Sequence, residues 1–318
     1  MLSIFHTTFP FFALVATGYL AARRGFLPST AVPALNTFVL YFALPCMLYR
    51  FGASSPIGQL LDASVAAVWL LCALVMVGFT IAMTRSARIN WNDASFGALV
   101  AAFPNTGFMG LPLLLALIGA RAAGPVIITI AIDMVITSSL CIALSRMDDA
   151  GANGVRAALK NAIKSIAANP MPWAIVLGVI ASAAEFGLPG PIDRTIELLA
   201  NAASPVALFT IGAVLARSPA TGATSLRLSD YVPVALFKLV LHPLLVLLVG
   251  AAAIRLGMPL DPFAYMVLIL VASLPSASNV ALLAERFGAN NERVARIIMV
   301  STVLSFLSFA GVVRLLVG

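Results

Sequence analysis

The sequence has few charged residues. Asp, Glu, Lys and Arg make up only 10% of its 318 residues, whereas 61% are hydrophobic. A soluble domain carries roughly 25% charged residues, because its surface faces water. The mean hydropathy is correspondingly high, at +1.05. This shortage of charge excludes a soluble globular protein and predicts an all-α polytopic membrane protein whose surface faces lipid.

The residues needed for several kinds of chemistry are also scarce. There are two histidines and three cysteines, and the cysteines are too scattered for a disulfide framework or a metal site. The chain has no H-E-x-x-H, G-x-S-x-G or phosphate-loop motif. Its basic residues form no stripe with interleaved aromatic residues, which argues against nucleic-acid binding. We therefore expect no enzymatic activity, no cofactor and no metal.

Long apolar runs, bounded by polar residues, predict about ten transmembrane helices, since a helical span needs about 20 apolar residues. The first run lacks a preceding basic residue and is followed by Arg23 and Arg24, the opposite of the charge order of a secretory signal. We expect it to be a retained span. The predicted spans are 2–22, 31–51, 61–84, 94–118, 123–145, 170–188, 194–216, 231–254, 263–284 and 295–317.

The basic residues between the spans predict the orientation. With the N-terminus outside, the inside positions are Arg23, Arg24, Arg85, Arg88, Arg146, Arg156, Lys160, Lys164, Arg217, Arg227, Arg286, Arg293 and Arg296. The outside positions are Arg50, Arg121, Arg194, Arg255 and Arg314. Cytoplasmic loops of membrane proteins carry the excess of Lys and Arg. The sequence therefore predicts a multi-pass protein of a bacterial-type inner (plasma) membrane with both termini outside.

One sizeable loop divides the chain into two halves of five spans. The domain expected is a single one, 1–318, with repeat one at about 1–145, an inside loop at 146–169 and repeat two at about 170–318. The loop is either a short amphipathic helix on anionic membrane lipid or a solvated basic linker. Five spans in each half give the second repeat an inverted topology, which is typical of secondary transporters.

Two sequence matches support the repeat. Pro45-Cys-Met-Leu-Tyr-Arg-Phe-Gly-Ala53 and Pro205-Val-Ala-Leu-Phe-Thr-Ile-Gly-Ala213 both read P-x-x-L-aromatic-x-x-G-A. Leu99-Val-Ala-Ala-Phe-Pro104 in span four likewise matches Leu270-Val-Ala-Ser-Leu-Pro275 in span nine. Each match falls in corresponding spans of the two halves.

The prolines of spans four and nine predict the substrate site. Proline removes an amide donor and interrupts a helix, and non-helical backbone at membrane depth lines a cavity or is buried in protein. A half-helix N-terminus also suits a carboxylate. The alternative is two ordinary proline kinks. The predicted substrate-binding residues are Pro104, Asn105, Thr106, Gly107, Pro275, Ser276, Ser278 and Asn279.

Three ionisable residues lie at membrane depth, where such groups are costly and commonly functional. Asp133 lies in span five, and Lys238 and His242 lie one turn apart in span eight. They form either a coupling-ion or substrate-charge site or a structural ion pair between Asp133 and Lys238 that joins two spans.

The span-four sequence Pro104-Asn-Thr-Gly-Phe-Met-Gly-Leu-Pro-Leu-Leu114 resembles the signature of the auxin efflux carrier family. That family includes the plant PIN exporters and bacterial carriers of malonate-type acids. Leu274-Pro-Ser-Ala-Ser-Asn279, Ala284-Glu-Arg-Phe-Gly288, Asn169-Pro170 and Ser301-Thr302 are similar to further parts of the family pattern. The chain departs from the PIN proteins at Pro172, where they carry asparagine, and it lacks their long hydrophilic loop.

The resemblance implies broken, crossing helices four and nine and a carboxylate bound near Asn105. It also implies an elevator-type transport domain from spans 3–5 and 8–10, a scaffold from spans 1, 2, 6 and 7, and a homodimer through the scaffold. The expected function is secondary active transport of small organic anions, either malonate-like dicarboxylates or auxin-like monocarboxylates. The alternative is a cation-coupled symporter or antiporter of the bile-acid or sodium–proton type, but the neutral residues at the break favour an anion. A membrane enzyme is a further, weaker alternative.

Overall fold

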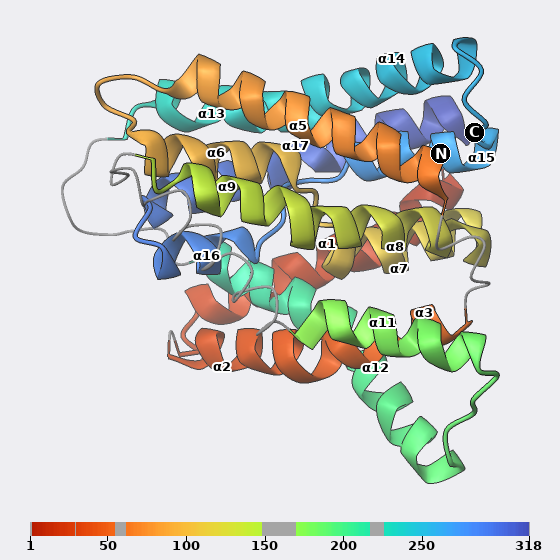
Figure 1. The fold of residues 1–318 in the computed structure, drawn as a ribbon. Coiled ribbons are helices and arrows are strands. Elements are labelled where there is room, and N and C mark those ends of the chain that lie inside the picture. Colours follow the sequence, from red (N-terminus) through yellow and green to blue (C-terminus); the bar gives the residue numbers. More distant parts are fainter. Residues whose placement is uncertain (1, 29, 55–61, 148–169, 217–225, 318) are drawn as a thin grey trace. The chain divides into compact units, whose positions relative to one another are not determined.

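The computed structural model describes residues 2–28, 30–54, 62–147, 170–216 and 226–317, and this part of the chain is helical throughout, apart from turns and two isolated bridges (Figure 1). Six of its helices are long and apolar enough to cross a membrane. They are Ala31–Ser54, Ala63–Thr84, Ala120–Leu144, Gly190–Val214, Leu228–Arg255 and Asn291–Leu316. Thr106–Ile118, Trp173–Ala183 and Pro262–Ala272 are shorter apolar helices. The prediction of a multi-pass α-helical membrane protein is confirmed.

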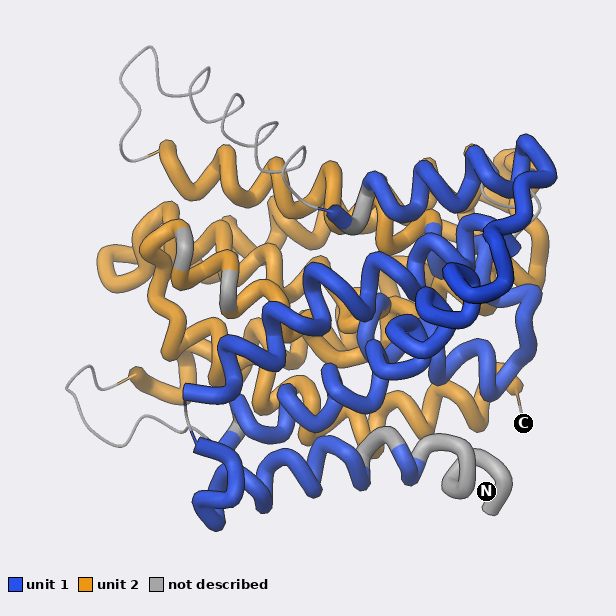
Figure 2. The backbone as a smooth tube through the Cα atoms, turned by 90° about the horizontal axis from the view of Figure 1, so that it is seen from below, with its two compact units in different colours: residues 1–62, 107–127, 169–222 blue, residues 63–106, 128–168, 223–318 orange. Residues whose placement is uncertain are grey.

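Each predicted span falls largely on one helix or on two or three consecutive helical segments. The predicted inside loop falls almost wholly on residues 148–169, which lie outside the described residues. The ten-span inverted repeat therefore stays a prediction. By its internal contacts the chain divides into two compact units, coloured separately in Figure 2.

The first unit comprises residues 1–62, 107–127 and 169–222. Its helix α1 packs along α12, and α3 packs along α11. The described elements that lie wholly within it are α1 (Leu2–Arg23), α2 (Ala31–Phe38), π-helical η1 (Val39–Ala43), α3 (Leu44–Ser54), α7 (Leu111–Ile118), η3 (Ala120–Ala122), α11 (Pro170–Ala183) and α12 (Gly190–Ala216).

Glycines allow both helix contacts of this unit. A Cβ atom on Gly212 of α12 would collide with the backbone carbonyl of Val15 in α1. A Cβ atom on Gly52 of α3 would lie 2.9 Å from the carbonyl oxygen of Ile175 in α11. Small residues let helix backbones approach closely in membranes, where apolar side chains gain nothing from leaving lipid. Gly52 and Gly212 are the glycines of the two matching P-x-x-L-aromatic-x-x-G-A sequences, so the repeated motif serves the same packing purpose twice.

The second unit comprises residues 63–106, 128–168 and 223–318. Helix α5 packs against α6 and α14, and α13 packs against α17. The described elements that lie wholly within it are α5 (Ala63–Thr84), α6 (Trp91–Ala102), η4 (Asp133–Thr137), α9 (Ser138–Leu144), α13 (Leu228–Leu236), η5 (Phe237–Leu241), α14 (His242–Arg255), α15 (Pro262–Ala272), α16 (Val280–Arg286) and α17 (Asn291–Leu316). Two more elements, η2 (Thr106–Gly110) and α8 (Ala123–Ile132), continue from one unit into the other.

Prolines explain several of the π-helical turns. A proline clashes with the carbonyl four residues earlier and gives it no donor, and a widened turn relieves the clash. Pro45, Pro112 and Pro243 each follow such a turn, η1, η2 and η5 respectively. The carbonyl of Phe108, which Pro112 leaves without its helical donor, accepts a 3.3 Å hydrogen bond from the hydroxyl of Ser204 instead.

Candidate functional site: a paired helix break and a buried polar cluster

Both predicted helix interruptions are present in the second unit. Helix α6 ends at Ala102, and the chain passes through Phe103, Pro104 and Asn105 before it becomes helical again at Thr106. Helix α15 ends at Ala272, and seven residues separate it from α16. Proline stands near the start of each interruption, as its missing amide requires.

The two interruptions pair with each other. Pro104 and Ser276 form an isolated antiparallel bridge. The amide of Asn105 donates to the carbonyl of Pro275 at 2.7 Å, and the amide of Ala277 donates to the carbonyl of Phe103 at 2.9 Å. Unpaired backbone groups are very costly away from water. Each broken segment therefore supplies hydrogen-bond partners for backbone groups of the other, and neither segment would be stable alone at membrane depth.

Side chains from two further helices complete the break after α15. The hydroxyl of Ser301 in α17 accepts the amide of Ser276 at 3.2 Å. The ammonium group of Lys238 donates to the carbonyl of Ala272, the last residue of α15, at 2.7 Å. A cation at a helix C-terminus also interacts favourably with the helix dipole. Lys238 therefore holds a carbonyl that the break leaves without its helical donor.

In the first broken segment the free donor is a side chain rather than a backbone amide. The amides of Asn105 and Thr106 are already used, by Pro275 and by the carbonyl of Pro104. Asn105 is 4% exposed, and within the described residues its side-chain amide has no recorded partner. The buried hydroxyl of Ser276 likewise has none among them. These two groups can bind a ligand without giving up a protein contact.

The other predicted binding residues are placed less centrally. Ser278 and Asn279 are half-buried, and Asn279 precedes α16 without a side-chain cap. The hydroxyl of Thr106 points to the Pro104 carbonyl at 3.4 Å. Gly107 follows Thr106 in η2, and a Cβ atom added there would lie 3.9 Å from the Leu44 side chain, an ordinary van der Waals contact.

Asp133 lies at the start of the π-helical turn η4 and is fully buried. Its Oδ1 accepts hydrogen bonds from the indole of Trp69 and from the hydroxyl of Thr137, both at 3.1 Å. Its Oδ2 is buried and has no hydrogen-bond partner in the described part of the chain. π-Helical turns occur frequently at functional sites, and an incompletely paired carboxyl group is costly in such an environment.

Lys238 and His242 lie on the other side of Trp69. The Lys238 ammonium lies 2.9 Å from Nδ1 of His242, and the imidazole ring lies 5.2 Å from the indole ring. When Lys238 is protonated it can only donate, and Nδ1 then accepts while the imidazole proton resides on Nε2. That Nε2 is buried and unpartnered within the described residues.

The direct Asp133–Lys238 ion pair considered from the sequence is not formed. Both residues are described, yet no oxygen–nitrogen contact within 4.0 Å joins them. Instead, Trp69 bonds to Asp133 and packs against His242, which contacts Lys238. The absence of direct contact matters for stability. Removing two charges from water is costly, and a buried ion pair offsets that cost only when its two groups are in close contact.

Two structural residues were missed by sequence reasoning. Trp69 is fully buried between the ionisable residues, and nothing in its apolar span marks it. Arg293, expected at an inside surface, is instead 2% exposed and donates to the carbonyls of Asp93 and Asp230 at 2.7 Å. Gly97 makes room for it, since a Cβ there would lie 2.6 Å from Nη1 of Arg293.

The site offers neutral hydrogen-bond donors rather than a cluster of metal ligands. In the described ranges there is no group of three or more His, Cys, Asp and Glu side chains that could hold a metal ion. Paired breaks with free amide and hydroxyl groups, in a multi-pass helical protein, are typical of membrane carriers. This defines the class of the protein.

Comparison with known proteins identifies the family. The chain belongs to the family described as "Membrane transport protein", whose model matches residues 3–313. It is 32% identical to the "Putative malonate transporter" of Rhizobium meliloti (strain 1021) over 315 residues, which cover 96% of this chain and 94% of that protein. It is 26% identical to "Uncharacterized transporter YfdV" of Escherichia coli (strain K12), covering 87% and 86%.

A plant protein shows the same relationship. "Auxin efflux carrier component 8" of Arabidopsis thaliana is 23% identical over 330 aligned positions, covering 86% of this chain and 87% of the plant protein. The resemblance to the auxin efflux carrier family is thereby confirmed. The chain is a multi-pass membrane transporter and not an enzyme.

Proposed function

We propose that this protein is a secondary active transporter of small organic anions that binds a carboxylate at the paired helix break. The observation that carries the proposal is the pair of unpartnered side chains at the break: the buried hydroxyl of Ser276 and, beside it, the side-chain amide of Asn105, neither of which has a recorded partner among the described residues. A buried polar group without a partner costs about 1–3 kcal/mol. A ligand that accepts hydrogen bonds from these side chains would supply the missing acceptors and explain why unpartnered polar groups lie beside the helix break.

A carboxylate suits the chemistry of the break better than a cation does. The side chains of Asn105 and Ser276 can both donate hydrogen bonds, and no acidic side chain belongs to either broken segment. Hydrogen bonds to a charged acceptor are the stronger ones. The name of the Rhizobium meliloti relative makes malonate the first substrate to test.

The mechanism that we propose is elevator-type alternating access in the inner membrane. The division of the chain into two units supports it, because each unit has its own helix packing and the chain changes unit immediately after the first break. The second unit would carry the substrate, and the first would form the static scaffold and the interface of a homodimer. We propose that both termini face outside.

The test is uptake of radiolabelled malonate by the purified protein in liposomes. Asn105→Ala should weaken malonate binding about 10- to 150-fold, the equivalent of losing a hydrogen bond to a charged group. Its thermal unfolding should change little, because no described residue loses a partner. Asn279→Ala is the matched control and should have a smaller effect. Normal binding and uptake by Asn105→Ala at unchanged protein yield would show that the substrate site lies elsewhere.

A further inference from the structure

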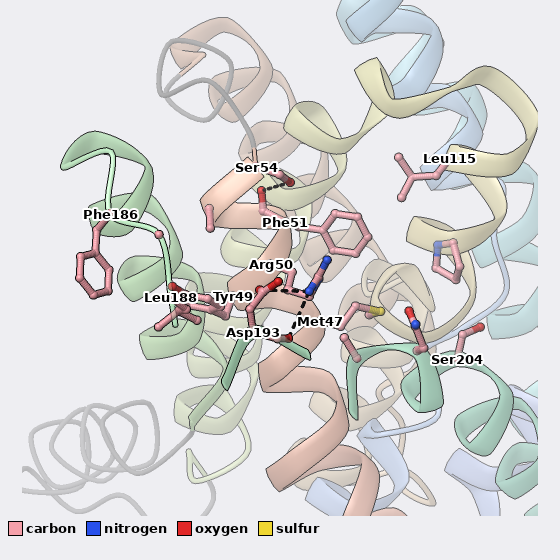
Figure 3. A pocket seen from close by; sticks show the side chains of 15 residues that line it. Met47, Tyr49, Arg50, Phe51, Ser54, Leu115, Phe186, Leu188, Asp193 and Ser204 are labelled. Atoms are coloured by element: carbon pink, nitrogen blue, oxygen red, sulfur yellow. Dashed lines mark hydrogen bonds and ion pairs between the residues drawn. The ribbon is translucent and has the colours of Figure 1, made fainter. Parts of the chain in front are cut away.

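A cavity of about 710 Å³ lies wholly within the first unit and belongs to none of the groups discussed above. It is formed by α3, α7, α12 and the turn that precedes α12 (Figure 3). Cavities of this size hold small organic ligands, and they combine apolar walls with a few polar groups that orient the ligand. Met47, Phe51, Leu115 and Leu188 supply apolar walls here.

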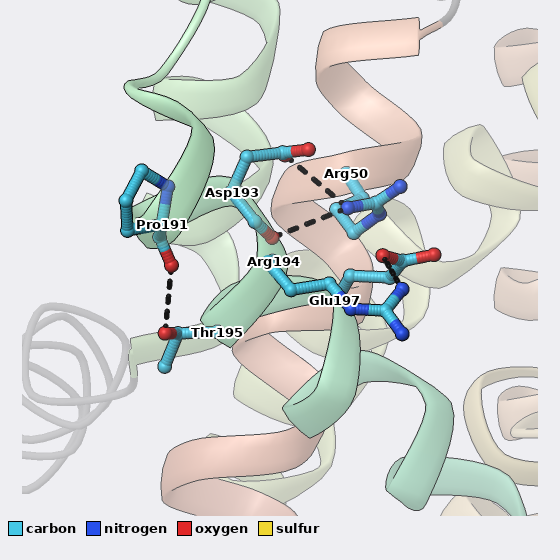
Figure 4. Close-up of polar contacts among 6 residues, drawn as sticks. All are labelled: Arg50, Pro191, Asp193, Arg194, Thr195 and Glu197. Atoms are coloured by element: carbon cyan, nitrogen blue, oxygen red, sulfur yellow. Dashed lines mark hydrogen bonds and ion pairs between the residues drawn. The ribbon is translucent and has the colours of Figure 1, made fainter.

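Arg50 is the cation of this cavity. Its Nη1 donates to Oδ1 of Asp193 at 3.2 Å and to the Asp193 carbonyl at 3.5 Å (Figures 3 and 4). Within the described residues, Nε and Nη2 have no recorded partner. Asp193 therefore fixes the guanidinium at the cavity through one nitrogen and leaves the remaining donors for a planar, two-oxygen acceptor.

Two further charged residues lie near Arg50, and one of them, Glu197, interacts electrostatically with its guanidinium. Arg194 is paired with Glu197 at 2.5 Å within the same turn of α12, and neither residue lines the cavity (Figure 4). On the cavity wall, α12 adds the polar side chains of Asn201 and Ser204. A ligand with one carboxylate and an apolar body matches this arrangement, whereas a second carboxylate would meet apolar walls or Asp193.

We propose that this cavity is a binding site for an apolar monocarboxylate, separate from the helix break of the second unit, with Arg50 as the group that recognises the carboxylate. The proposal does not depend on which substrate the break binds. Because Asp193 competes with the ligand for the guanidinium and repels its charge, Asp193 limits the affinity of the site.

The test measures binding of 3-phenylpropionate by calorimetry to the full chain in phosphatidylcholine nanodiscs, which contain no anionic lipid. Arg50→Gln should weaken binding about tenfold or more, because it removes a charged hydrogen-bond donor. Asp193→Asn should strengthen binding. Both variants lose the same ion pair, so a purely structural role of that pair would move both affinities in the same direction. Thermal unfolding of both should differ little from wild type, since exposed ion pairs stabilise weakly.

Arg194→Gln is the matched control and should leave binding within about twofold of wild type, since its charge is already paired outside the cavity. Asn105→Ala should also leave it unchanged, which separates this site from the proposed transport site. The uncharged analogue 3-phenylpropionamide should bind far more weakly. Equal binding of acid and amide, equal effects of the two arginine variants, or weakened binding in Asp193→Asn would overturn the proposal. Nanodiscs with added phosphatidylglycerol reveal whether a lipid phosphate competes with the acid for Arg50. The proposal would also be overturned if the acid only displaced bound phosphatidylglycerol and did not bind in nanodiscs that lack this lipid.

Discussion

The hydroxyl of Ser301 is the group whose removal tests the paired break most directly. It accepts the amide of Ser276 at 3.2 Å and donates to the carbonyl of Ile298 at 3.0 Å. Ser276 is fully buried, and its amide has no other acceptor recorded among the described residues. Ser301→Ala therefore leaves a buried amide without a partner. The Ile298 carbonyl keeps a donor, because Thr302 also bonds to it at 2.7 Å.

The expected magnitude follows from these contacts. An orphaned buried amide costs about 1–3 kcal/mol, and the better helix propensity of alanine returns about 0.5 kcal/mol. Ser301→Ala should thus lower the free energy of unfolding by about 0.5–2.5 kcal/mol. Ser305→Ala is the matched control, because Ser305 is equally buried in the same helix and, among the described residues, its hydroxyl bonds only to the Thr302 carbonyl at 2.8 Å.

Thermal unfolding in detergent compares the two variants, and hydrogen exchange at Ser276 locates the effect. We expect Ser301→Ala to be less stable than Ser305→Ala and to show faster exchange at the Ser276 amide. Equal stability of the two variants, with Ser276 still protected, would mean that α17 does not support the break and that our account of the pairing is wrong.

Three further predictions concern other parts of the molecule. Asp133→Asn should cost less than the roughly 3–5 kcal/mol lost when a buried ion pair is broken, because no direct pair joins Asp133 to Lys238; a low folded yield that Lys238→Met restores in the double variant would contradict this. Gly212→Val should prevent the close contact of α12 with α1 and reduce folded yield, whereas Gly78→Val, with nothing within 4 Å, should not; equal yields would refute the packing role. A C-terminal reporter that fluoresces only in the cytoplasm should stay dark, as the predicted charge distribution requires; a bright fusion would reverse the proposed topology.

Much of the fold could be predicted because it depends on local chemistry. The membrane environment follows from the shortage of charge, and the helix breaks follow from Pro104 and Pro275, since proline lacks an amide wherever it stands. The two broken segments and Asn105 could be predicted as the substrate site for the same reason, because they follow these prolines. The matching sequences of spans four and nine supported this prediction. The family was evident from the residues that follow Pro104.

The partners of these residues could not be predicted. Asn105 and Thr106 each use their backbone amide inside the protein, so in the first broken segment only the side chain of Asn105 remains free for a ligand, and this depends on where the carbonyl of Pro275 lies. Arg293 has the sequence position of a loop residue, yet Gly97 and two backbone carbonyls place it in the interior.

The sequence by itself determined that the chain is helical, spans a membrane and is interrupted at two prolines, because hydropathy and missing amides are properties of single residues and short segments. Only the tertiary structure decided that the interruptions pair, that Lys238 bonds to Ala272 rather than to Asp133, and that Arg50 lies at a cavity. These contacts join residues far apart in the chain, and their geometry depends on helix packing that glycines such as Gly52 and Gly212 permit.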